Sequence, residues 1–242
     1  FTDPASPTAC YWQNSTLVDL DPVSTGTVTD IYVHGGVIQV VGLDSGDIFY
    51  WNSNTKTRLT LGKQAGTTLP RFYASSGTTL VTGRDTAGTS AVYCSMTSAT
   101  SAKPADTAAI AGQNSTAIWL DGSTVYRAGW TAANLPCFWQ DGVQTILDDD
   151  ASLTAGYATA IKAVDGSLTV TGLCTYGGVT NRPFVYRDTD TSDASAGSLT
   201  VLSSLKVNGA DQRMGTYFYG LTPFLLAGFD EGGAPVAGYY YS

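Results

Sequence analysis

The sequence predicts an all-β fold. Short apolar segments with alternating polarity end in glycine and are followed by polar turns, and no segment has the periodicity of an amphipathic helix. The 34 threonines outnumber the 12 basic and 20 acidic residues taken together. Because β-branched residues favour strands, this composition supports the same prediction.

One four-stranded unit recurs five times along the chain. Its second strand ends in a glycine, at Gly42, Gly83, Gly129, Gly172 and Gly228. A first strand precedes each glycine, at 30–36, 71–77, 117–122, 160–166 and 216–222. A third strand follows at 48–51, 91–94, 136–139, 183–186 and 235–238, and a short fourth strand comes after it, as at 57–61 and 143–147. Four strands per repeat are typical of the blades of a β-propeller.

The repeat therefore predicts a five-bladed β-propeller of four-stranded antiparallel blades, with residues 1–242 forming one domain. A sandwich or barrel is the alternative, but neither would need the same aromatic pair and glycine at matching positions. The repeat resembles kelch and WD-type blades in layout, which implies the fold and no activity. Trp12, Trp51, Trp139 and Tyr186 recur at one position, where we expect them to pack between blades.

The strand count suggests how the ring closes. We expect the N-terminal strands in residues 1–20 to complete the last blade through Cys10, Tyr11, Trp12, Leu17 and Leu20. Residues 235–242 then form a surplus strand, in which Val236, Tyr239, Tyr240 and Tyr241 are the candidate assembly residues. Such a strand can add to a neighbouring subunit through main-chain hydrogen bonds.

Composition restricts the partners and the compartment. The net charge of −8 and the pI near 4.4 argue against binding nucleic acid or an anionic membrane surface. No apolar stretch is long enough for a membrane helix, so membrane insertion is not expected. The start at Phe1, four cysteines and sequons at Asn14 and Asn114 predict an extracellular or cell-surface glycoprotein.

The four cysteines allow three disulfide pairings. Cys10 and Cys137 hold the same repeat position in blades that are not neighbours, so we do not expect them to pair. Cys94 lies one step out of phase with Cys137 and faces the opposite way, which favours a Cys94–Cys137 bond. Cys174 is then left for Cys10.

Catalytic groups are few. His34 is the only histidine, and the sequence has neither a G-x-S-x-G nucleophile elbow nor a C-x-x-C pair, so we expect no serine-hydrolase triad and no metal site. The outline resembles five-bladed furanosidases, a resemblance that implies acidic residues on the innermost strands. Only Asp30 meets that expectation, although glycoside cleavage needs two carboxylates. We therefore predict that the chain is not an enzyme.

Two acidic clusters, 148–150 and Asp188 with Asp190 and Asp193, are candidate calcium loops, but they lack the order of an EF-hand. We expect solvated loops and no cofactor, with calcium as the alternative.

Two functions fit these features. The first is a non-enzymatic structural protein that self-associates by strand exchange into a surface filament or layer. The second is a lectin-like or adhesive propeller that binds glycans, as the resemblance to five-bladed lectins implies. Its candidate pocket is formed by Trp119 and Trp130, which interrupt the repeat.

Overall fold

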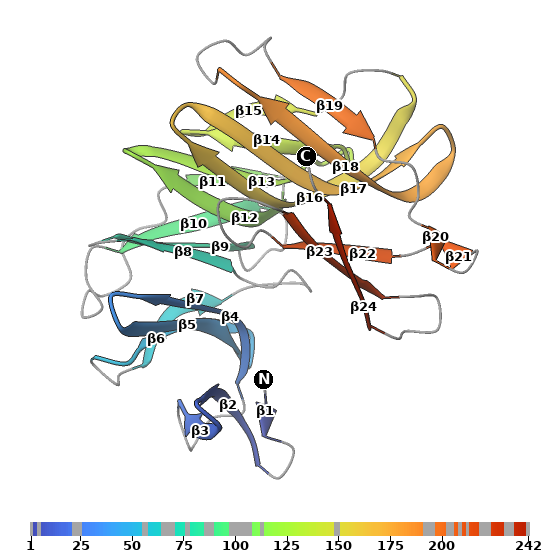
Figure 1. The fold of residues 1–242 in the computed structure, drawn as a ribbon. Helices are drawn as coiled ribbons and strands as arrows, with labels where there is room; N and C mark the ends of the chain where they lie inside the picture. The colour runs from blue at the N-terminus through green and yellow to red at the C-terminus, as the bar shows by residue number, and fades with distance from the viewer. Residues whose placement is uncertain are drawn as a thin grey trace. The chain divides into compact units, whose positions relative to one another are not determined.

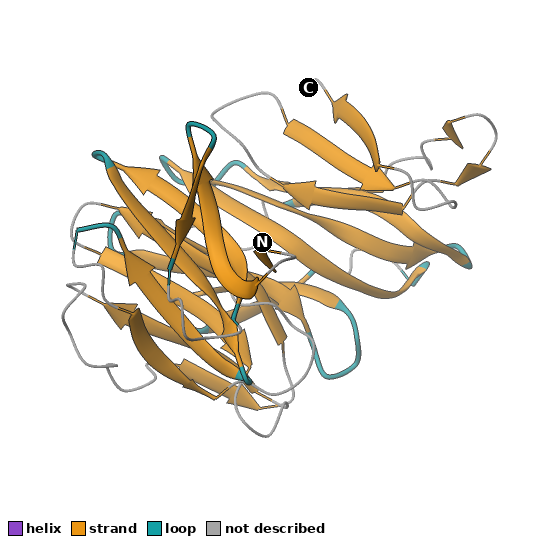
Figure 2. Cartoon of the chain, turned by 90° about the horizontal axis from the view of Figure 1, so that it is seen from below, coloured by secondary structure: helices purple, strands orange, loops and turns teal. Residues whose placement is uncertain are grey.

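The computed structural model consists of β-strands joined by turns and loops (Figures 1 and 2). It describes residues 2–3, 6–20, 26–54, 58–63, 71–75, 78–84, 90–96, 108–111, 114–147, 151–190, 197–201, 206–207, 210–211, 213–217, 224–229 and 235–240. Within these residues no helix is present, and thus none that could span a lipid bilayer. The all-β prediction is confirmed for this part of the chain.

The chain divides into two compact units, Phe1–Thr116 and Ala117–Ser242. In the first unit, a three-stranded sheet has the order β1-β2-β3 and two four-stranded sheets have the orders β4-β5-β6-β7 and β11-β10-β9-β8. Their bounds are β1 (Thr2–Asp3), β2 (Ser6–Gln13), β3 (Thr16–Asp19), β4 (Thr27–His34), β5 (Val37–Asp44), β6 (Asp47–Asn52), β7 (Arg58–Lys63), β8 (Arg71–Ser75), β9 (Thr78–Arg84), β10 (Ser90–Met96) and β11 (Ala108–Ala111).

The second unit holds two further four-stranded sheets, ordered β12-β13-β14-β15 and β16-β17-β18-β19, with the pair β20-β21 and the sheet β22-β23-β24. Their bounds are β12 (Asn114–Asp121), β13 (Thr124–Trp130), β14 (Pro136–Gln140), β15 (Val143–Ile146), β16 (Leu153–Val164), β17 (Ser167–Tyr176), β18 (Val179–Asp188), β19 (Ser198–Val201), β20 (Lys206–Val207), β21 (Ala210–Asp211), β22 (Arg213–Tyr217), β23 (Phe224–Phe229) and β24 (Pro235–Tyr240). Each four-stranded sheet follows chain order and matches one predicted repeat.

The repeat extends to the register of single residues. In β4 the pairing with β5 slips between Val28 and Asp30, and in β16 the pairing with β17 slips between Ala158 and Ala160. At the extra residue of each bulge, a threonine hydroxyl donates to a carbonyl of the next strand: Thr29 to Val41 over 3.3 Å, and Thr159 to Thr171 over 3.4 Å. The two sheets therefore share one local design, bulge included.

The strand-final glycines have a steric cause. Gly42 lies opposite Phe49, and Gly172 lies opposite Phe184. A Cβ atom at either glycine would overlap both that ring and a carbonyl oxygen of the first strand, Thr27 or Tyr157. Glycine is therefore required where the first strand and the ring of the third strand both approach the backbone of the second.

Aromatic residues form much of the core of each unit. Trp51, Trp139 and Tyr186, at the predicted packing position, are buried. Tyr11 of β2 contacts Trp51 with ring centroids 5.8 Å apart, and Phe138 contacts Tyr186 at 5.7 Å. Trp12 is the exception, because it is 62% exposed.

A buried polar network joins consecutive sheets of the first unit. The Tyr50 hydroxyl donates to Gln39 Oε1 over 2.7 Å, and the Thr79 hydroxyl of the next sheet donates to the same oxygen over 3.1 Å. Asn52 Nδ2 donates to the Tyr50 hydroxyl over 3.4 Å. Because a buried amide left without partners is costly, this network favours one alignment of the two sheets.

The strand pairing corrects the expected closure. β23 is bonded to β22 on one side and to β24 on the other, with Val236 opposite Gly228 and Tyr239 opposite Leu225. The N-terminal strand with Cys10 and Trp12 is bonded to β1 and β3 instead. The third strand of the last sheet therefore comes from the C-terminus, since a partner reached by a short loop loses less chain entropy. Tyr241 lies outside the described residues.

The expected closing residues divide between core and surface. Cys10, Tyr11 and Leu20 are buried, whereas Leu17, which is paired with Trp12 across the β2–β3 hairpin, is exposed like its partner.

Candidate functional site

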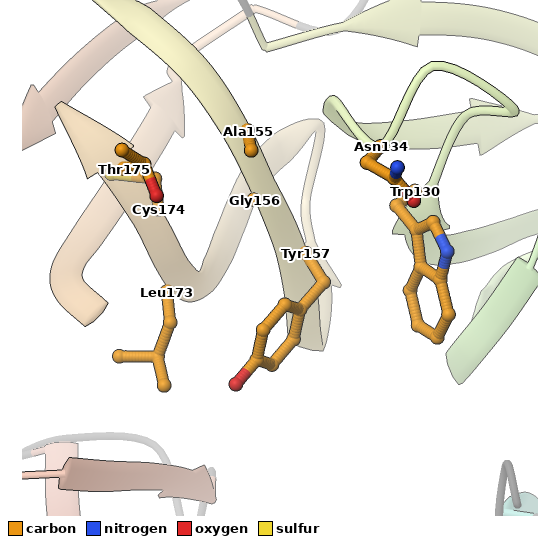
Figure 3. A pocket seen from close by; sticks show the side chains of 8 residues that line it. All are labelled: Trp130, Asn134, Ala155, Gly156, Tyr157, Leu173, Cys174 and Thr175. Atoms are coloured by element: carbon orange, nitrogen blue, oxygen red, sulfur yellow. The ribbon is translucent and has the colours of Figure 1, made fainter. Parts of the chain in front are cut away.

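A cavity of about 390 Å³ lies in the second unit, where β13 ends and β16 begins. Figure 3 shows its lining, and the side chains of Trp130, Tyr157 and Leu173 point to the same side. The full lining is Trp130, Asn134, Ala155, Gly156, Tyr157, Leu173, Cys174 and Thr175. The cavity is therefore built from two neighbouring sheets and the loop between β13 and β14.

Two aromatic rings dominate this cavity. Trp130 is the last residue of β13, and Tyr157 lies on β16 before its second bulge. Their rings meet edge to face, with centroids 6.0 Å apart and an interplanar angle of 68°. Tyr157 is 40% exposed although it is large and aromatic. Rings held partly open to solvent beside an amide such as Asn134 offer flat apolar faces and hydrogen-bonding groups together.

The fold itself does not require these rings. Tyr157 is paired with Leu173, and the next residue of β16 is paired with Gly172. In the first unit, Thr27 holds the same position opposite Leu43. Trp130 follows Gly129 as Leu43 follows Gly42 and Leu173 follows Gly172. Thr27, Leu43 and Leu173 therefore show that the scaffold does not need an aromatic residue at the positions of Tyr157 and Trp130.

The loop that carries Asn134 is held by Thr131. The buried Thr131 hydroxyl accepts hydrogen bonds from the backbone N–H groups of Ala133, over 3.2 Å, and Leu135, over 3.1 Å. Its backbone N–H donates to the Leu135 carbonyl and its carbonyl accepts from Asn134, both over 2.9 Å. Asn134 has a φ of 59°, a left-handed conformation that asparagine tolerates better than most residues. The loop is thus fixed without a ligand.

β16 is tied to this loop. The Gly156 N–H donates to the Asn134 carbonyl over 2.7 Å. A side chain at Gly156 would collide with the Leu173 carbonyl and with Cys174. The missing side chain therefore lets β16 lie close to both the loop and β17.

Cys174 contributes a neutral thiol to the cavity wall. Burial raises its pKa to about 11, and the positive charge of Arg182 lowers it only in part. A thiol that stays protonated at neutral pH is a weak nucleophile, so the geometry gives Cys174 a packing role.

Only one of the two predicted pocket residues lies at the cavity. Trp130 lines the cavity, whereas Trp119 does not. Trp119 lies near the β12–β13 turn, where Lys162 Nζ sits 6.0 Å from its ring centroid. Tyr157 was not predicted, although an alignment of residues 157–172 with residues 27–42 matches it with Thr27.

Among the side chains that the structure describes, neither expected disulfide is formed. Cys137 and Cys174 are buried thiols, and the side chain of Cys94 is outside the described part. Cys137 lies opposite Gly129, the place that Phe49 and Phe184 hold opposite their glycines. Cys137 thus stands where those two phenylalanines place their rings against the opposite glycine.

The sequons differ in accessibility. Asn14 is exposed in the two-residue turn between β2 and β3, with φ of 47°, whereas Asn114 is buried at the start of β12. Glycosylation of either residue stays a prediction.

Calcium binding also stays a prediction. Asp188 is buried and accepts a hydrogen bond from the Asp190 N–H over 2.9 Å, while 148–150 and Asp193 lie outside the described residues. Across the residues that are described, no three His, Cys, Asp or Glu side chains are grouped as a metal site.

Comparison with solved structures identifies the fold. The chain is similar to an endo-arabinase from Bacteroides thetaiotaomicron, with a TM-score of 0.51, 10% identity, and coverage of 88% of this chain and 93% of that one. A bifunctional GH43-CE protein of Bacteroides eggerthii gives a TM-score of 0.48 at 10% identity, covering 98% of this chain, which spans only 35% of its length. The extracellular domains of Drosophila semaphorin 1b give 0.48 at 11% identity, covering 93% and 54%. No protein-family model matches the sequence, and no curated protein matches it.

The likeness to the arabinase confirms a β-propeller fold, and it corrects two predictions. A non-enzymatic, self-assembling structural subunit was expected, with a lectin-like protein as its alternative, and the chain was expected not to be an enzyme. The chain instead shares its fold with an endo-arabinase along nearly the whole length of both chains. These predictions relied on two observations. One was the scarcity of acidic residues on the first strands, and the other was a surplus C-terminal strand, which in the structure pairs with β23 of the same chain.

Proposed function

We propose that this protein is a glycoside hydrolase that binds a polysaccharide chain in the cavity beside Trp130 and Tyr157. The observation that carries the proposal is the partly open aromatic pair, at two positions where the β4–β5 repeat has threonine and leucine. Sugar rings present C–H faces to aromatic rings and hydroxyls to amides, and the cavity offers both kinds of partner. The whole-chain likeness to an endo-arabinase supports the choice of a hydrolase.

The cavity binds and does not itself cleave. Its lining contains no carboxylate, whereas glycoside hydrolysis uses a pair of carboxylic groups as acid and as base or nucleophile. Asp30 is our candidate for one member of the pair. It is half-buried at the bulge of β4, where β16 has Ala160, and its Oδ1 accepts from the Ile31 N–H over 3.0 Å.

Asp30 therefore departs from its register equivalent Ala160, as Tyr157 departs from Thr27. The Ile31 N–H stabilises the ionised carboxylate, as a base or nucleophile requires.

The test is release of reducing ends from arabinan, xylan and galactan by the purified full chain. We expect product from at least one of them, and we expect Asp30→Asn to lower the rate by at least about a hundredfold while glycan binding persists. Asp165→Asn is the matched control, because Asp165 is an exposed turn residue with φ of 51°, which asparagine tolerates. No product from any of the three glycans would contradict the proposal.

We further propose five blades. Four are the four-stranded sheets, and β22-β23-β24 supplies three strands of the fifth. We propose a single domain and an extracellular location, where polymeric glycans too large to enter a cell are found. A glycan is the proposed partner.

A further inference from the structure

We infer that an N-linked sugar on Asn14 packs on Trp12 and Leu17 and covers an apolar face of the β2–β3 hairpin. The inference goes beyond the proposed hydrolysis, because it gives a modification of the first unit a structural role. It follows from the register of the hairpin, the burial of its two faces and the position of the sequon in its turn.

The β2–β3 hairpin has the same design as the β14–β15 hairpin. Trp12 and Trp139 are each the last but one residue of their strand, and each pairs across a two-residue turn. The first turn residue, Asn14 or Asp141, has a φ of 47° in both. Trp139 is fully buried, however, whereas Trp12 is 62% exposed. The β2–β3 hairpin therefore carries the aromatic residue of the repeat without the cover that it has in β14.

One face of this hairpin is buried and the other is exposed. Tyr11 and Val18 are paired and belong to the core of the first unit, where Tyr11 contacts Trp51. Because successive side chains of a strand point to opposite faces, the next pair, Trp12 and Leu17, lies on the other face. Leu17 is exposed there beside Trp12. An apolar cross-strand pair therefore faces away from this core.

The turn of the same hairpin presents a sequon. Asn14 and Ser15 form the turn and Thr16 is the first residue of β3, so the N-x-S/T pattern lies at the tip. All three residues are exposed. The acceptor amide is therefore open to a modifying enzyme in the folded hairpin.

The modification needs an oligosaccharide donor that is carried on a lipid pyrophosphate. Asn14 Nδ2 forms a bond to C1 of the first sugar, and the bond from C1 to the pyrophosphate oxygen breaks. The lipid pyrophosphate leaves with the electron pair of that bond, and Nδ2 gives up one proton.

The attached sugar reaches the apolar pair. Asn14 follows Trp12 by two residues, which span at most about 7 Å of extended chain. A sugar ring has a face of C–H groups that packs on an aromatic ring, while its hydroxyls stay in water. The sugar therefore covers the ring of Trp12 and leaves a polar surface outside.

The area of this face favours a sugar over a second copy of the chain. A fully exposed aromatic side chain offers about 250 Å² at most, and Leu17 adds less. Each partner of a stable dimer buries about 800 Å². A sugar tethered two residues away needs no such area, because its contact with Trp12 is intramolecular.

The test compares the full chain secreted by a eukaryotic host with its Thr16→Val variant, which lacks the sequon. This variant keeps Asn14, and valine is the residue that β15 has at the equivalent position, Val143. Hydroxyl-radical labelling followed by peptide mass spectrometry reports the oxidation rate of each tryptophan. We expect Trp12 to be oxidised at least about threefold more slowly in the glycosylated chain, because the sugar covers its ring. The rate at Trp119, in the second unit, should stay the same.

Stability supplies a second measurement. Urea unfolding should show that the sugar raises the folding equilibrium constant of the wild type about tenfold, measured against Thr16→Val. Trp12→Thr should abolish this gain when it is measured with and without the sequon, whereas Trp12→Phe, which keeps an aromatic face, should retain most of it.

Three results would overturn the inference. The first is a secreted, folded chain without sugar on Asn14. The second is oxidation of Trp12 at the same rate with and without the sugar. If that common rate is slow, sedimentation of Thr16→Val then assigns the cover to a second copy or, for a monomer, to the chain itself. The third is a stability gain that survives Trp12→Thr.

Discussion

Tyr157 occupies in β16 the place that Thr27 occupies in β4: each precedes the residue that pairs with a buried glycine, and each is exposed. The carbonyls of both residues lie against that glycine, so the backbone there is fixed in the same way. The side chain, in contrast, faces outward and is free to vary. The backbone of Tyr157 thus serves the sheet, and its side chain is available for the glycan contact that we propose.

Replacing Tyr157 with threonine should separate these roles. We expect Tyr157→Thr to lower glycan affinity about tenfold, or about 1.4 kcal/mol, because an aromatic contact face is lost. The midpoint of thermal unfolding should stay near that of the wild type, since the equivalent sheet already uses threonine. Calorimetric titration and a melting curve on the same sample check both values, and a large drop in melting temperature would contradict this division of roles.

Thr131 should act on binding through the loop it holds. We expect Thr131→Val, which keeps the shape but removes the acceptor, to weaken glycan affinity about tenfold because two N–H groups lose their partner. Thr131→Ser should restore most of the affinity, because the serine hydroxyl can accept the same bonds. Equal losses in both variants would contradict this role, because Thr131→Ser keeps the hydroxyl.

Alkaline pH should destabilise the second unit through its buried thiols. Burial raises the pKa of Cys137 to about 12, against partial lowering by a hydrogen bond with Gln144 and by the charge of Arg127. Since the folded state holds the proton more tightly than the unfolded one, this stability is present below pH 9 and is lost toward pH 12. The loss should be about 1.4 kcal/mol per pH unit in that window.

Urea unfolding at pH 8, 10 and 11 measures this dependence. The variant Cys137→Ala should be less stable at pH 8, because it leaves a cavity, and should lose less on going to pH 11. An unchanged pH slope in the variant would assign the effect to other groups.

The sequons should differ when the chain is secreted by a eukaryotic host. Asn14 lies exposed in a tight turn and should carry a glycan in the folded protein. Asn114 is buried at the start of β12, and a chain modified there should fail to fold. Mass spectrometry of peptides from the secreted protein should find sugar on Asn14 only, and a stable protein modified at Asn114 would contradict this reading.

Much of the fold was predictable because its causes are local. The glycines at 42 and 172 and the aromatic residues Trp51 and Trp139 repeat at fixed spacing, and the structure buries all four. Trp12 shares the pattern but not the environment, because its strand lies between β1 and β3 and not in a four-stranded sheet. Pairing between distant segments is not encoded in local periodicity, which is why the closure was predicted wrongly.

The site was predictable only in part. Trp130 was a candidate because it interrupts the repeat, and it lines the cavity, whereas Trp119, chosen for the same reason, does not. Tyr157 could not be distinguished from the other tyrosines of the sequence, because its place in the cavity depends on which face of β16 is exposed. The positioning of Asn134 depends on three-dimensional hydrogen bonds to Thr131 and Gly156 that sequence spacing does not reveal.

The shared bulge of β4 and β16 has a consequence for how such a chain changes over generations. Repeats that share one backbone conformation can exchange residues at equivalent positions. A residue that one repeat accommodates is therefore compatible with the backbone of another. A recognition surface can then be gained, lost or moved from repeat to repeat by one or two exchanges at outward positions such as Thr27 and Leu43. The repeated backbone of this protein thus offers several equivalent positions at which a new specificity could arise.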